Sequence, residues 1–255
     1  MLSGLDQTAF NIFPVLRKRA PAPVYEIRNS AIHGQGVFAL SDLNPGDVII
    51  DERIALGVPH ISKKQDELNF RLAYRVFQQA TLSCQALVLQ LTDTTHSARL
   101  RQIRQEFLLY QESERSRAMA VVSKFINNAF ADLAGSYVML ETSRINHSCL
   151  PNANGGRYGS RYAVRAIKPI CKGEEILISY INVLCTYAER QRRLESWDIT
   201  CSCTLCSGYH PRNGQRMRLS NVMNELQKKE TMDLFEEAMA CTKDTAELMS
   251  VRANL

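Results

Sequence analysis

A run of nine residues, 144–152 (RINHSCLPN), concentrates groups that could bind a ligand or take part in catalysis. It contains two amides, an imidazole, a hydroxyl, a guanidinium and a thiol. A hydrophobic core has no use for so much hydrogen-bonding capacity in one place. Taken alone, the run has two interpretations. It is either a polar turn that ends at Pro151 and is stabilised by Asn152, or the centre of a functional site.

A second group of reactive side chains lies near residue 200, where three of the eight cysteines form the pattern C-x-C-x-x-C at Cys201, Cys203 and Cys206. The start of the chain lacks the basic and apolar stretches of a signal peptide, so we expect a protein of the nucleus and/or cytoplasm that is not secreted. In a reducing compartment, clustered thiols indicate a metal rather than disulfides, with three free thiols in a loop as the alternative. Structural zinc takes four tetrahedral ligands. The candidates for the fourth are Cys149, His210 and Cys241.

Composition places the chain among globular proteins. Its 255 residues are 45% hydrophobic and 22% charged, enough for one sizeable domain or two small ones. The net charge of +5 is scattered, without a long Lys/Arg block or interleaved aromatics. We therefore expect no direct nucleic-acid binding, although a basic peptide or an acidic partner remains compatible. The apolar runs are too short to span a membrane, so no membrane association is expected.

The elements on either side of the polar run are predicted to be mostly β. Strands are expected near residues 25–27, 48–50, 137–140, 161–167 and 176–180. The pair Gly34-x-Gly36 predicts a tight loop that enters a strand. It is not a dinucleotide fingerprint, because no third glycine and no helix follow. Such a loop is either a simple turn or a place where a ligand approaches the backbone closely.

Between the β-rich parts the pattern changes to helical spacing. Apolar residues recur at helical intervals in 67–77, 97–110 and 118–133, and no proline occurs between Pro59 and Pro151. Thr186 and Glu189 form a capping box that starts a helix running to about Trp197. Further helices are predicted within 216–253.

Four motifs occur in a fixed order along the chain: Gly34-x-Gly36, Asn146-His147-Ser148-Cys149-x-Pro151-Asn152, Gly173-Glu174-Glu175-Ile176 leading to Tyr180, and the C-x-C-x-x-C cysteines. Together they resemble the SET-domain protein-lysine methyltransferases over about residues 24–207. The stretch from Ile178 to the cysteines is most similar to the SET-and-MYND subgroup and its fungal relatives. The MYND zinc finger itself is missing, because Cys84 is the single cysteine of the insertion and the other zinc ligands are absent.

The resemblance implies an α+β, β-rich fold of small β-sheets with a pseudoknot. In it, the segment around Asn146 and His147 threads beside the strand that ends at Tyr180. The expected divisions are an N-terminal leader (1–23), a SET domain (24–183) with a helical insertion (57–136), a zinc-binding post-SET segment (184–207) and a C-terminal helical tail (208–255).

The resemblance also implies an activity, the S-adenosylmethionine-dependent N-methylation of a lysine in a histone or another protein. Tyr180 would be the catalytic residue, orienting the amine and lining the methyl-transfer pore. One structural zinc would join Cys149 to Cys201, Cys203 and Cys206. The residues expected around S-adenosylmethionine are His33, Gly34, Gln35, Gly36, Asn146, His147 and Tyr180, with Trp197 or Ile199 over the adenine.

Two other functions remain compatible with the sequence. The first is a catalytically inactive SET-like binding or scaffold protein. The second is a plain zinc-binding interaction module, which would leave the glycine loop and Tyr180 unexplained. For the enzyme, the expected partner is a protein substrate, and the protein is expected to be a monomer.

Overall fold

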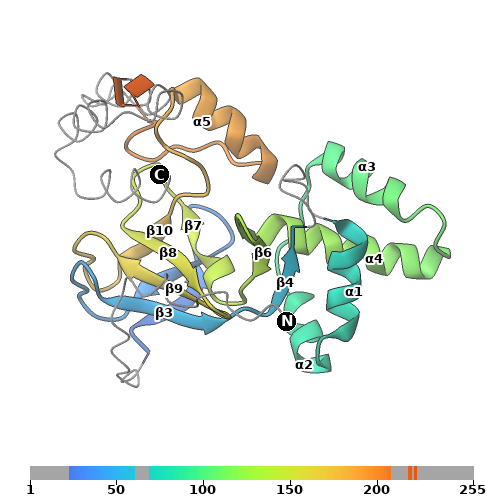
Figure 1. Ribbon diagram of the computed structural model, residues 1–255. Coiled ribbons are helices and arrows are strands. Elements are labelled where there is room, and N and C mark those ends of the chain that lie inside the picture. Colours follow the sequence, from blue (N-terminus) through green and yellow to red (C-terminus); the bar gives the residue numbers. More distant parts are fainter. Residues whose placement is uncertain (1–22, 61–68, 208–217, 220, 223–255) are drawn as a thin grey trace, which may run out of the picture.

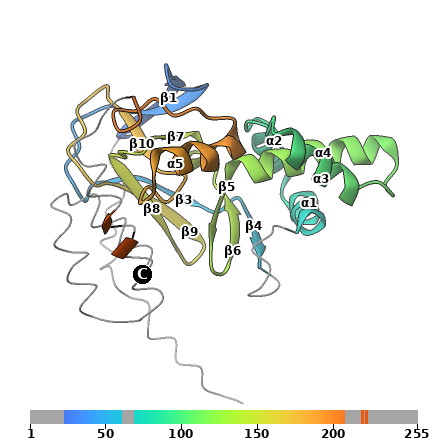
Figure 2. The same cartoon turned by 90° about the horizontal axis from the view of Figure 1, so that it is seen from above.

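The computed structural model describes residues 23–60, 69–207, 218–219 and 221–222. The strands form three small sheets, and the larger helices gather beside them (Figure 1; Figure 2). The first sheet has the order β1 (Tyr25–Asn29), β2 (Gln35–Ala39), β10 (Glu175–Ile178), β7 (Asn146–His147). The second has the order β3 (Val48–Arg53), β9 (Arg161–Ala166), β8 (Ala153–Tyr158), and the third β4 (Leu56–Pro59), β6 (Gly135–Val138), β5 (Ala129–Asp132).

The first sheet joins segments that are far apart in the chain. β7 pairs in parallel with β10, with Asn146 opposite Leu177 and His147 opposite Ile178. On its other side β10 pairs antiparallel with β2. The motif that contains Asn146 therefore lies beside the strand that leads to Tyr180, as expected. The observed architecture is the predicted α+β, β-rich arrangement of small sheets.

Branched aliphatic side chains from the first two sheets form one core. Such side chains pack well on pleated surfaces, which is why these segments become strands. The core cluster consists of Val37, Ala39, Leu43, Ile49, Ile50, Ile145, Ala153, Val164, Ala166, Ile170, Ile176 and Ile178. Because Ile145 belongs to this cluster, its burial fixes the backbone from which the following polar residues project.

The insertion contributes a helical lobe with its own core, on the right of Figure 1. Its helices are α1 (Phe70–Gln79), α2 (Leu82–Val88), α3 (Ser97–Glu106) and α4 (Glu112–Asn128). Phe77, Phe107 and Phe125 are fully buried there, and Tyr74 packs edge-on against Phe107. These four helices lie within the predicted insertion, and Cys84 packs against their core as a structural residue.

One helix prediction was wrong at its end. The apolar spacing predicted a helix over 118–133, but α4 ends at Asn128 and residues 129–132 form strand β5. β5 pairs with β6, which also pairs with β4, so the insertion is not helical throughout. β5 and β6 form a tight hairpin, and β6 is held in its sheet by β4, which lies far earlier in the chain, so sheet pairing outweighs local helical spacing here.

The segment after the sheets begins with the predicted capped helix. The Thr186 side chain accepts a hydrogen bond from the Glu189 N–H (3.2 Å), and α5 covers Tyr187–Leu194. The chain continues as a 3₁₀ turn, η2 (Glu195–Trp197), so the predicted end near Trp197 is confirmed with a tighter last turn. A second 3₁₀ turn, η1 (Thr142–Arg144), precedes β7. Most of the leader and the predicted helices of 216–253 lie outside the described residues, and none of the described helices is long and apolar enough to cross a membrane.

Candidate functional site

The Gly34-x-Gly36 loop needs both glycines, for different reasons. Gly34 has a φ of +48°, a left-handed conformation that a Cβ disfavours. At Gly36 a Cβ would collide with the Glu175 carboxylate and lie 3.0 Å from the Cβ of Ser30. The loop therefore turns tightly and packs its backbone directly on a charged side chain. Its tip, with His33, Gly34 and Gln35, is exposed to solvent.

The side chain of Asn146 holds this loop in place. Its Nδ2 donates to the carbonyl oxygens of His33 (3.1 Å) and Gln35 (3.0 Å) and to Oε1 of Glu175 (2.8 Å). Asn146 is only 7% exposed, although the loop it contacts is more than 100 residues away in the chain. Because three acceptors surround Nδ2, the orientation of the amide is determined by its contacts.

Two further polar residues support the site, and sequence reasoning gave them no role there. Glu175 also accepts a hydrogen bond from the Ser30 hydroxyl (2.9 Å), so its carboxylate connects the loop to Asn146. One of the two interpretations of the polar run made Asn152 a turn residue. Instead, its Nδ2 donates to the Glu175 carbonyl (2.8 Å) and its Oδ1 accepts from the Leu177 N–H (2.7 Å). It therefore continues the β7–β10 pairing with its side chain, a role that local sequence does not reveal.

His147 connects the tyrosine to the cysteines. Its Nδ1 accepts a hydrogen bond from the Tyr180 N–H (3.0 Å), and its Nε2 lies 3.3 Å from the Cys149 Sγ. Burial lowers the pKa of His147 to about 4, so the ring is neutral at pH 7. With Nδ1 acting as an acceptor, the single proton resides on Nε2 and points at the sulfur.

Tyr180 is oriented by the polar run. Its hydroxyl donates to the Ile145 carbonyl (2.6 Å), and its ring lies 5.3 Å from that of His147. Burial raises the pKa of Tyr180, so the phenol remains protonated and able to donate. The predicted catalytic hydroxyl is thus held by the carbonyl of Ile145, the residue that precedes Asn146 in the chain.

The two candidates for the adenine cover, Trp197 and Ile199, pack against the same cluster but differ in their other contacts. The Trp197 ring centroid lies 5.5 Å from that of Tyr180, and its Nε1 donates to the Asn127 carbonyl at the end of α4 (3.2 Å). Ile199 packs against the cluster that contains Cys149 and Cys201. Trp197 therefore extends an aromatic surface from Tyr180 toward the insertion, whereas Ile199 belongs to the cysteine-rich segment.

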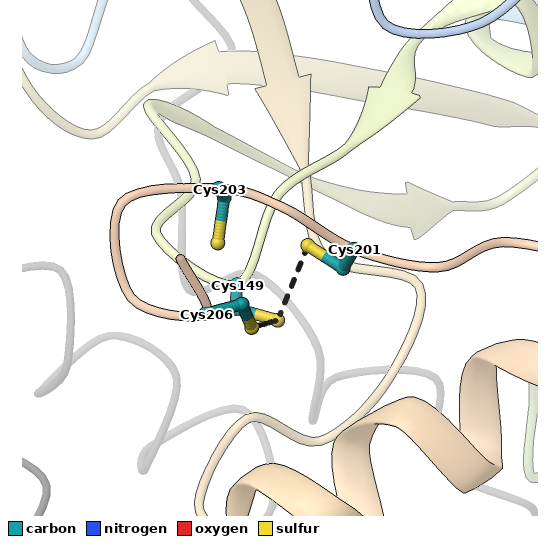
Figure 3. A group of neighbouring side chains, drawn as sticks. All are labelled: Cys149, Cys201, Cys203 and Cys206. Atoms are coloured by element: carbon teal, nitrogen blue, oxygen red, sulfur yellow. Dashed lines mark hydrogen bonds between the residues drawn. The ribbon is translucent and has the colours of Figure 1, made fainter. Parts of the chain in front are cut away.

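The four predicted zinc ligands meet in one place (Figure 3). The sulfur atoms of Cys149, Cys201, Cys203 and Cys206 all lie within 4.8 Å of one another. Cys149 Sγ is 3.9 Å from Cys201 Sγ and 3.6 Å from Cys206 Sγ. With a Zn–S bond of about 2.3 Å, the edges of a tetrahedron measure about 3.8 Å. The donor set and its spacing fit a structural zinc site. The competing ligands His210 and Cys241 lie outside the described residues.

The short distances between the sulfur atoms also shift the pKa values of the thiols. Hydrogen bonding to Cys201 and Cys203 raises the pKa of the Cys149 thiol. Hydrogen bonds from Cys149 and Cys201 lower the pKa of the Cys203 thiol. The sulfurs are thus close enough to share protons, which a bound metal ion would displace.

Comparison with known proteins agrees with this arrangement. A family model for the SET domain matches residues 34–181, more than half of the sequence, and the chain therefore belongs to the SET-domain family. The N-lysine methyltransferase SMYD2 of Gallus gallus is 39% identical over 74 residues, and that of Homo sapiens is 38% identical over the same length. The matched segment is 29% of this chain but only 17% of either relative. Among solved structures, Rubisco LSMT bound to AdoMet is similar with a TM-score of 0.48 and 12% identity, over 78% of this chain and 59% of that one.

Proposed function

We propose that the protein is an S-adenosylmethionine-dependent protein-lysine N-methyltransferase. The observation that carries the proposal is the parallel pairing of β7 with β10. It puts Asn146, which contacts the Gly34-x-Gly36 loop, next to His147, which contacts Tyr180. Membership of the SET-domain family and partial identity to proteins named N-lysine methyltransferases support it.

The exposed loop and Asn146 suit the amino-acid end of the cofactor. The Nδ2 of Asn146 is taken up by the loop and Glu175, whereas no described residue donates to its Oδ1. That oxygen is left to accept a hydrogen bond from an ammonium group. S-adenosylmethionine, when bound, supplies a methyl group activated by its attachment to a positively charged sulfur.

Tyr180 and Trp197 suit the substrate amine. A lysine has an ordinary pKa near 10.4 and must lose its proton before it can attack a methyl group. The neighbouring aromatic rings form an apolar wall that favours the neutral amine. Because the Tyr180 hydroxyl donates its proton to Ile145, its lone pairs face away from that carbonyl and accept contacts from the amine or from a polarised methyl group. Alignment of this kind contributes roughly 7–11 kcal/mol to lowering the barrier.

The test is transfer of a labelled methyl group. The purified chain is incubated with methyl-labelled S-adenosylmethionine, histones and cell extract, and labelled proteins are identified by mass spectrometry. Label on a lysine that is lost in Tyr180→Phe and retained in Tyr187→Phe supports the proposal. Tyr187 is a matched control because it is half exposed at the start of α5. Cofactor binding by calorimetry without any transfer would favour the scaffold alternative, and no cofactor binding would refute the proposal.

We also propose that the protein acts on a histone or another protein in the nucleus and/or cytoplasm. The seven cysteines of the described residues form no disulfide with one another, and four of them gather into a cluster that suits a metal ion, which fits a reducing compartment. Imaging of the tagged protein in its own cells tests this proposal.

A further inference from the structure

A fully buried arginine lies against the four cysteines. Arg190, on α5, is 1% exposed and is the largest fully buried side chain in the described part of the chain. Arginine is almost never fully buried unless it is paired. The question is therefore which group compensates the charge of this buried guanidinium.

The guanidinium contacts a carbonyl and a sulfur. Nη1 donates to the Cys185 carbonyl (2.7 Å), and Nη2 donates to the Cys206 Sγ (3.7 Å). Nε is buried without a hydrogen-bond partner. Among the described residues, no carboxylate forms an ion pair with Arg190. The acidic residue of its own helix, Glu189, pairs instead with the exposed Arg192 and Arg193.

The charge balance requires a negative partner. Removing an ion from water costs several kcal/mol even after relaxation, and an unpaired buried charge is strongly destabilising. Around Arg190, the cysteine sulfurs are the described groups that can become negative. Four neutral thiols would leave the guanidinium uncompensated. Four thiolates around one Zn²⁺ carry a net charge of −2, which the guanidinium reduces to −1.

We propose that Arg190 is the built-in counter-cation of the four-cysteine site, donating to the Cys206 thiolate and slowing both metal loss and attack on that sulfur. A hydrogen bond from a charged donor withdraws electron density from a thiolate and strengthens the positioning of a metal ligand. Through Cys185, the same side chain also ties the start of α5 to the metal-binding loop. The proposal rests on zinc occupying the site and is independent of methyl transfer.

The test uses the full chain, purified with its zinc under reducing conditions, with three substitutions. Arg190→Met keeps a long apolar side chain without the charge, and Arg190→Lys keeps the charge without the planar fork. Arg192→Met removes a charge from the exposed face of the same helix, where a surface ion pair contributes little. Transfer of zinc to a chromophoric chelator is timed, and alkylation of each cysteine by iodoacetamide is followed by mass spectrometry.

We expect Arg190→Met to lose zinc about tenfold faster than wild type, the scale of one charged hydrogen bond. Among the four cysteines of the metal site, Cys206 should become the first to be alkylated in Arg190→Met. Arg190→Lys should lie between Arg190→Met and wild type, and Arg192→Met should match wild type. The role of Arg190 would be refuted if Arg190→Met lost zinc at the wild-type rate. It would also be refuted if alkylation became faster by the same factor at all four cysteines of the metal site. If Arg190→Met does not fold, Arg190→Lys decides. Faster alkylation of Cys206 supports the proposal and a wild-type rate refutes it. If the wild-type protein is purified without zinc, the metal site itself is refuted. That result is independent of the outcome of the methylation assay.

Discussion

The position of the glycine loop depends on one amide, and Asn146→Ala removes it. The substitution deletes the contacts from Nδ2 to the carbonyls of His33 (3.1 Å) and Gln35 (3.0 Å) and to the Glu175 carboxylate (2.8 Å). Two N–H bonds serve these three acceptors, so the loss amounts to about one hydrogen bond to a carbonyl and one to a charged group.

The expected loss of stability follows from these contacts. A hydrogen bond to a neutral acceptor contributes about 1 kcal/mol and one to a charged group about 1.5–3 kcal/mol. Because His33 and Gln35 are exposed, water replaces part of what their carbonyls lose. We therefore expect Asn146→Ala to lower the free energy of unfolding by about 2–3 kcal/mol. For a domain of this size that corresponds to a decrease in Tm of about 4–12 °C.

Urea and thermal unfolding measure this change, and calorimetry measures S-adenosylmethionine binding, which we expect to weaken at least about tenfold, the effect of 1.4 kcal/mol. Asn154→Ala is the control, because Asn154 accepts from the N–H of the adjacent Gly155 and holds no distant segment. Asn146→Asp places a second carboxylate against Glu175, and adding Glu175→Gln restores a donor between the two positions. The double variant should recover part of the stability.

Two results would refute this reasoning. A change within about 0.5 kcal/mol, typical of surface substitutions, would mean that Asn146 does not hold the loop in solution. A double variant no more stable than Asn146→Asp alone would mean that residues 146 and 175 are not coupled.

Three further substitutions test the rest of the site. Tyr180→Phe should lower turnover far more than cofactor affinity, because its hydroxyl acts on the reacting groups; equal kcat values would remove it from the mechanism. Cys149→Ser should lose zinc by metal analysis while exposed Cys171→Ser keeps it; full zinc content in Cys149→Ser would place the fourth ligand elsewhere. Gly36→Ala should destabilise the fold by about 1–3 kcal/mol, as overpacking does, because its Cβ meets the Glu175 carboxylate. Unchanged unfolding would show that Glu175 moves aside freely.

Local sequence predicted the elements whose determinants lie close together in the chain. The capping box at Thr186 and Glu189 is such a case, since the cap and the first turn that it stabilises are three residues apart. The same local pattern failed at residues 129–132. There the apolar spacing fitted a helix, but the backbone found its partner in β6. β6 in turn pairs with β4, at residues 56–59, and no window of local sequence contains this third strand of the sheet.

At the site, the kinds of reactive groups and the order of the motifs could be predicted from the sequence. The cysteine spacing indicated a metal, and the two glycines indicated either a simple turn or a close approach to the backbone. The tertiary structure decided which partners they meet. Cys149 joins cysteines that begin 52 residues later, and Asn146 reaches a loop 111 residues earlier. It also decided that Arg190 faces the cysteines rather than solvent. The site forms when β7 pairs with β10, because Ile145, which precedes β7, is buried in one core with Ile176 and Ile178 of β10, and this burial fixes the register of the two strands.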